Sequence, residues 1–60
     1  MRAYSLTELM NLTRNELFAL HWQIADALAL LSEGSSERDT ALANLRDIRR
    51  VLARREFAPR

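Results

Sequence analysis

The chain has 60 residues, a formal net charge of +1, one histidine and no cysteine. A single domain this small buries only about 60% of its unfolded surface and usually needs a staple to be stable. The absence of cysteine excludes a disulfide staple, and one histidine without thiolates does not build a structural zinc site. Self-association is therefore the staple that we expect.

A short helix is predicted over about residues 6–11. Ser5 is followed three residues later by Glu8, the spacing of a capping box in which hydroxyl and carboxylate satisfy backbone donors at a helix start. The segment carries four apolar side chains, which are Leu6, Leu9, Met10 and Leu12.

A second capping box, Thr13 with Glu16, predicts a longer helix over about residues 14–33. Twelve of the fifteen residues 17–31 are apolar, which is more than one buried stripe requires. At helical spacing they form two stripes, offset by one residue. The first comprises Leu17, Leu20, Ile24, Leu28 and Leu31, and the second comprises Phe18, Trp22, Ala25 and Ala29.

A third helix is predicted over about residues 37–55. Gly34 suits a left-handed C-cap of the preceding helix, and Ser35 or Ser36 suits the N-cap of the next. Such a short connection predicts an antiparallel helical hairpin, so residues 1–60 are expected to form one all-α domain. The apolar side of this helix should pack on the first stripe through Ala41, Leu42, Leu45, Ile48 and Leu52.

The second stripe needs a cover that the hairpin itself does not supply. We expect a homodimer in which two hairpins form a four-helix bundle, with Phe18, Trp22, Ala25 and Ala29 at the dimer interface. The alternative is a three-helix monomer in which the N-terminal helix folds back over the same side chains.

The chain lacks the residue patterns of catalytic and cofactor sites. With one glycine it has no phosphate-binding loop, and it has no metal-ligand spacing or partnered nucleophile. His21 is interpreted as a residue at the edge of the core. Asp26 is interpreted as a buried carboxylate paired with an arginine. We therefore expect a non-catalytic protein without cofactor or metal.

All nine basic residues are arginines, and they are unevenly distributed. Residues 1–37 hold two arginines against five acidic residues, a balance of −3, whereas residues 38–60 hold seven against three, a balance of +4. An arginine stripe on the last helix could track a phosphate backbone. A small nucleic-acid-binding protein using Arg46, Arg49, Arg50 and Arg54 is thus the second candidate, and a solvated, partly ion-paired helix face is the plain alternative.

The N-terminal segment lacks the apolar run and cleavage site of a signal peptide, and no apolar stretch is long enough to cross a bilayer. These features predict a cytoplasmic protein without membrane contact.

The segments YSLTELMNLTRNELFALHWQIA and ALANLRDIRRVLARR resemble short uncharacterised helical-hairpin proteins of proteobacterial plasmids and integrative elements. The resemblance implies a bacterial accessory protein of the cytosol with no defined activity. LFALHWQIA and LRDIRRVLARRE are also similar in outline to the two-helix protein of the large ribosomal subunit near the tunnel exit. That family is rich in lysine, which this chain lacks. This second resemblance implies that Arg46, Arg49 and Arg50 match rRNA contacts.

Overall fold

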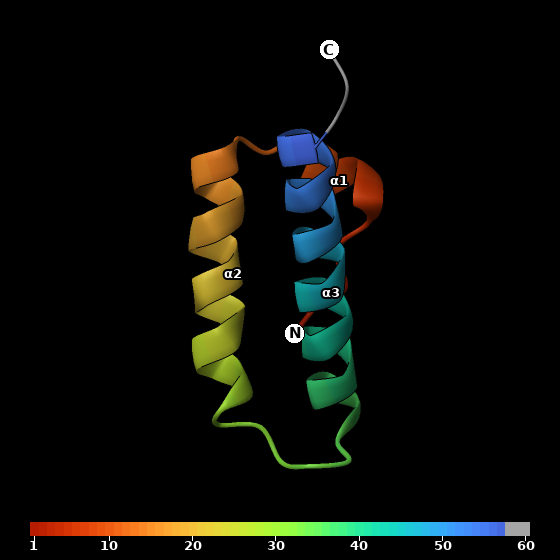
Figure 1. The fold of residues 1–60 in the computed structure, drawn as a ribbon. Coiled ribbons are helices and arrows are strands. Elements are labelled where there is room, and N and C mark those ends of the chain that lie inside the picture. The colour runs from red at the N-terminus through yellow and green to blue at the C-terminus, as the bar shows by residue number, and fades with distance from the viewer. Residues whose placement is uncertain (58–60) are drawn as a thin grey trace.

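The computed structural model describes residues 1–57, with side chains through Arg55, and contains three helices and no strand in that range. They are α1 (Leu6–Met10), α2 (Arg14–Leu28) and α3 (Ser36–Phe57). α2 and α3 lie side by side and run in opposite directions, and α1 packs beside the C-terminal half of α3 (Figure 1). The all-α prediction is confirmed.

Both capping boxes form as the sequence predicts. The Ser5 hydroxyl accepts from the Glu8 backbone N–H at 3.1 Å, and the Glu8 carboxylate accepts from the Ser5 N–H at 3.2 Å. Thr13 and Glu16 make the same reciprocal pair at 3.1 and 2.9 Å. These bonds satisfy orphan donors at the first turns of α1 and α2 and fix where each helix begins.

The end of α2 was predicted wrongly. The helix stops at Leu28 rather than near residue 33, and two tighter turns follow, with Leu30 N–H bonded to Ala27 C=O and Leu31 N–H to Leu28 C=O. A helix reaching residue 33 would leave only two residues before α3 begins at Ser36. Unwinding after Leu28 lengthens the connection and still lets Leu31 pack against the core.

The connection ends in a helix cap. Gly34 has φ +79°, the left-handed conformation expected of it, but it lies six residues beyond α2 and so does not cap that helix. It directly precedes Ser35, whose hydroxyl accepts from the Arg38 N–H at 3.1 Å. Ser35 is therefore the N-cap of α3, one of the two candidates that the sequence offered.

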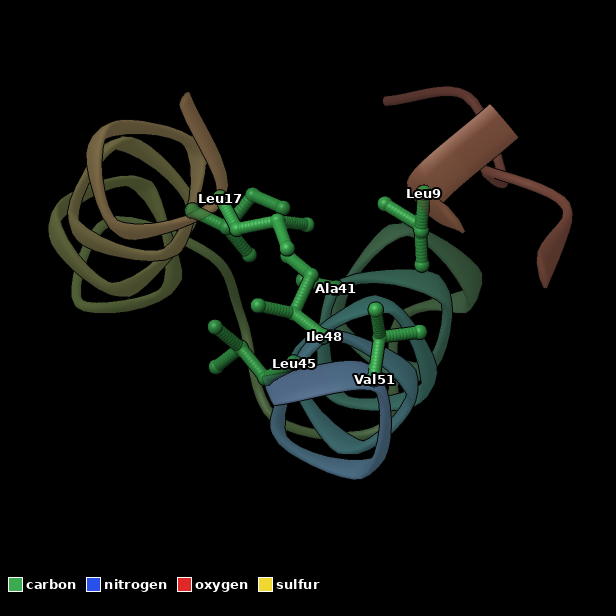
Figure 2. Packing of buried hydrophobic residues seen from close by; sticks show 7 residues of the cluster. Leu9, Leu17, Ala41, Leu45, Ile48 and Val51 are labelled. Carbon is green, nitrogen blue, oxygen red and sulfur yellow. The ribbon is translucent and has the colours of Figure 1, made fainter. Parts of the chain in front are cut away.

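The core lies between α3 and the two other helices. Leu9 of α1 and Leu17 of α2 point toward a row of α3 side chains (Figure 2). Leu20, Leu28 and Leu31 of the first stripe are partly buried against this core, as expected. The fully buried apolar residues are Leu9, Leu17, Ile24, Ala41, Leu45, Ile48 and Val51.

Two α3 residues differ from expectation because α3 packs against two helices rather than one. Val51, which was not predicted to be buried, lies under Leu9 of α1 (Figure 2). Leu42, which was expected in the core, is 45% exposed. The α1 helix thus shifts the buried arc of α3 toward one side and leaves the other side open.

A buried polar residue holds the N-terminal segment in place. Asn44 is 1% exposed, and its side-chain amide accepts from the Tyr4 N–H at 3.0 Å and donates to the Arg2 C=O at 2.9 Å. Asn44 was not singled out from the sequence. The available signal was its place beside Ala41 and Ile48 on the apolar side of the helix, where a polar residue needs a partner.

Candidate interaction surface

The second stripe of α2 lies outside the core. Trp22 is 62% exposed and Phe18 is 38% exposed, while Ala29 is exposed and Ala25 is half-buried. The helix α1 packs against α3 rather than over these side chains (Figure 1). The alternative in which the N-terminal helix covers the second stripe within one chain is therefore wrong.

Helical geometry extends this surface onto α3. In an antiparallel pair of right-handed helices, a rotation of about 100° per residue carries the residue after each inward position to the same side of the pair. Phe18 follows the buried Leu17, and Leu42 follows the buried Ala41. We call the surface they share the open face, which comprises Phe18, Trp22, Ala25, Ala29 and Leu42.

The open face and α1 lie on opposite sides of the helix pair. Val51 points toward Leu9 of α1, whereas Leu45 points to the other side of α3 (Figure 2). Residues that follow the inward positions are therefore on the Leu45 side, away from α1. Nothing within the described chain covers the exposed indole of Trp22.

Two aromatic contacts order the side chains of the open face. The guanidinium carbon of Arg14 lies 5.4 Å from the centre of the Phe18 ring, which is within cation–π range. The His21 ring meets the Trp22 ring edge-on, with centroids 5.3 Å apart and an angle of 83° between the ring planes, an arrangement that aromatic pairs favour. His21 is half-buried beside the core, in line with its interpretation as an edge residue.

Asp26 was interpreted wrongly. It is exposed rather than buried, because it is two residues beyond Ile24 and so lies on the outer side of α2, almost directly opposite α3. A carboxylate in water needs no arginine partner, and no arginine side chain of residues 1–55 forms an ion pair with Asp26.

The predicted arginines are displayed on the outside of α3. Arg46, Arg49, Arg50 and Arg54 are all exposed. Arg46 and Arg50 are each two residues from the buried Ile48, which places them on the side of α3 that faces away from α2. Among side chains of residues 1–55, Arg46 is the only one of the four in an ion pair, at 3.8 Å from Asp47. Ion pairing on the helix surface therefore accounts for little of the stripe.

Arg55 has a structural role. Its guanidinium donates to the Met10 C=O at 2.7 Å and so caps the C-terminal end of α1. This bond ties α1 to the C-terminal part of α3, 45 residues further along the chain.

Within the described residues, no three acidic or histidine side chains come together in a way that would hold a metal ion. Over the same range, no helix combines the length and apolar character needed to span a bilayer. Comparison with protein-family models, curated proteins and solved structures finds no match to this chain.

Proposed function

We propose that the protein is a small, non-catalytic interaction module that acts as a homodimer. Two helical hairpins pack through their open faces into a four-helix bundle, with Trp22 and Phe18 as the central anchors. The small side chains of Ala25 and Ala29 let the paired helices approach closely. The role of the module is to bind or regulate in the bacterial cytoplasm, and the resemblance to proteins of plasmids and integrative elements supports an accessory role there.

The observation that carries this proposal is the large apolar surface that the single chain leaves in water. The described residues include seven buried apolar residues, one of them an alanine, and seven large apolar residues that are exposed. Scattered exposed hydrophobics are ordinary, but contiguous apolar surface around an indole is typical of interfaces. Three of the seven exposed residues, Phe18, Trp22 and Leu42, belong to the open face.

The surface area is sufficient for a specific dimer. A standard interface buries about 800 Å² on each partner. The whole chain exposes 4551 Å², so such an interface would take less than a fifth of it. Two helices of 15 and 22 residues supply a face long enough for that area.

Sedimentation equilibrium over a range of concentrations tests the proposal. The wild-type chain should be dimeric, and Trp22→Glu should be a monomer because it places a charge at the centre of the interface. Leu30→Glu is the matched control, since Leu30 is 87% exposed just beyond the end of α2 but outside the open face. A monomeric wild type, a dimeric Trp22→Glu, or equal weakening by both variants would contradict the proposal.

The second candidate function is nucleic-acid binding through Arg46, Arg49, Arg50 and Arg54. It is favoured by the exposure of all four side chains and by the single ion pair that they make with side chains of residues 1–55. If it holds, a mixed-sequence duplex should bind at low salt with an affinity that falls as salt rises, and Arg46→Gln with Arg50→Gln should reduce the slope by about one per lost phosphate contact. Binding that does not depend on salt would rule it out.

A further inference from the structure

α1 and the C-terminal half of α3 enclose a cavity of about 170 Å³. It opens on the side of the molecule away from the open face, because α1 lies on that side. Leu6 and Met10 form its apolar wall and Val51 its floor, and three guanidinium-bearing side chains form the remaining wall. The lining residues are Leu6, Met10, Arg50, Val51, Arg54 and Arg55.

The charge on this cavity is of one sign. The described residues that line it include three arginines and no carboxylate. Arg55 is engaged with the Met10 carbonyl, but Arg50 and Arg54 are exposed and enter no ion pair with the side chains of residues 1–55. A concave surface with uncompensated positive charge attracts anions.

The apolar wall is also unfilled. Leu6 is 42% exposed and Met10 is 55% exposed, although both lie on a helix packed against the core. Leu9, on the same helix, is completely buried. The occupant should therefore bring an apolar group to cover Leu6 and Met10 as well as a negative charge for the arginines.

The volume limits the size of that apolar group. A cavity of about 150 Å³ lined by apolar side chains admits one benzene molecule. The 170 Å³ between α1 and α3 therefore admits one Leu or Phe side chain. Sites for whole small ligands usually measure about 300 Å³ or more. A phosphate backbone would meet the arginines but has no apolar group of this size to place between α1 and α3.

We propose that this cavity is a docking site for an acidic peptide segment of a partner protein. One Leu or Phe side chain of the peptide enters between Leu6 and Met10, and flanking carboxylates pair with Arg50 and Arg54. Arg50 and Arg54 are one helical turn apart, so their guanidinium groups can hold separate carboxylates on either side of the inserted side chain. The site is independent of the open face and leaves the proposed dimer intact.

Fluorescence anisotropy with a defined probe tests this site on the full chain. The probe is a labelled peptide with one phenylalanine flanked on both sides by glutamates. It should bind saturably and shift the NMR signal of the Met10 methyl group. Replacing its phenylalanine by alanine, or its glutamates by glutamines, should weaken binding about tenfold or more, the effect of losing about 1.4 kcal/mol.

The protein variants separate this site from the rest of the arginine stripe. Arg50→Gln with Arg54→Gln should lose at least tenfold in affinity, whereas Arg46→Gln, a change outside the cavity, should leave it unchanged. No saturable binding, binding without a Met10 shift, or equal loss in Arg46→Gln would overturn the proposal. So would a single-stranded oligonucleotide that shifts Met10 when the peptide does not, an outcome that assigns the cavity to nucleic acid. Sedimentation of the same samples keeps this result separate from the dimer.

Discussion

The side-chain oxygen of Asn44, in the middle of α3, accepts a hydrogen bond of 3.0 Å from the backbone N–H of Tyr4, 40 residues earlier in the chain. The amide nitrogen of the same side chain donates to the Arg2 carbonyl, so one amide pairs with two backbone groups of the N-terminal segment. That segment consequently runs along α3 before α1 begins (Figure 1). This pairing, together with the Arg55 bond to Met10, fixes α1 on one side of the helix pair.

Asn44→Ala should destabilise the fold by about 1–3 kcal/mol, because it leaves a partly buried N–H and C=O without partners. For a domain of this size each kcal/mol lowers the melting temperature by about 4–8 °C. Thermal unfolding followed by circular dichroism measures the effect.

The matched control for Asn44 is Asn15→Ala, because Asn15 is exposed and its side chain has no hydrogen-bond partner among the described residues. A surface substitution of this kind should change stability by less than about 0.5 kcal/mol. Equal effects of the two substitutions would show that the Asn44 amide contributes nothing specific.

Thr13→Ala removes the hydroxyl that accepts from the Glu16 N–H at the start of α2. The loss of such a cap should cost about 0.5–2 kcal/mol. Thr13→Ser keeps that hydroxyl and should retain most of the stability. Urea unfolding of the two variants gives the comparison. A serine variant as unstable as the alanine variant would mean that the cap is not what stabilises this end of α2.

The stability of the N-terminal region should decrease in acid. The hydrogen bond from Arg2, at 2.7 Å, and the Ser5 backbone N–H lower the pKa of Glu8 below its ordinary value of 4.5. The Thr13 backbone N–H lowers the pKa of Glu16 in the same way. A carboxyl whose folded pKa is lowered stabilises the fold above its unfolded pKa, and this contribution is lost as the pH falls through the folded pKa.

An NMR titration of the side-chain carboxyl groups checks this expectation. Arg2→Gln should raise the pKa of Glu8 toward 4.5 and leave that of Glu16 where it is, because Arg2 contacts only Glu8 of the two. If Arg2→Gln left the Glu8 titration unchanged, the ion pair would not be formed in solution.

Gly34→Ala should destabilise the protein by about 1–2 kcal/mol, the cost of placing a Cβ in the left-handed region. The φ of Gly34 is +79°, and no neighbouring atom lies within 4 Å of a Cβ built there. The cost is therefore conformational rather than steric against neighbours. Gly34→Asn should cost less than Gly34→Ala, since asparagine tolerates this conformation better. Denaturant unfolding of both variants measures the difference, and an alanine variant as stable as the wild type would contradict the assignment.

The sequence by itself determined the local features of this protein. Both capping boxes, the Ser35 cap and the first apolar stripe of α2 were predicted, because each rests on interactions between residues three or four positions apart. The exposure of Trp22 and Phe18 in the single chain was also anticipated, since two apolar stripes on one helix exceed what a single partner helix can cover.

Only the tertiary structure decided what depends on distant parts of the chain. The position of α1 follows from hydrogen bonds that span 40, 42 and 45 residues, and no periodicity encodes them. The choice of α3 rather than the Trp22 side as the packing partner of α1 buries Val51, exposes Leu42 and creates the arginine-lined cavity. The end of α2 at Leu28 was likewise set by the path back to α3, because residues 29–33 contain neither glycine nor proline to mark it.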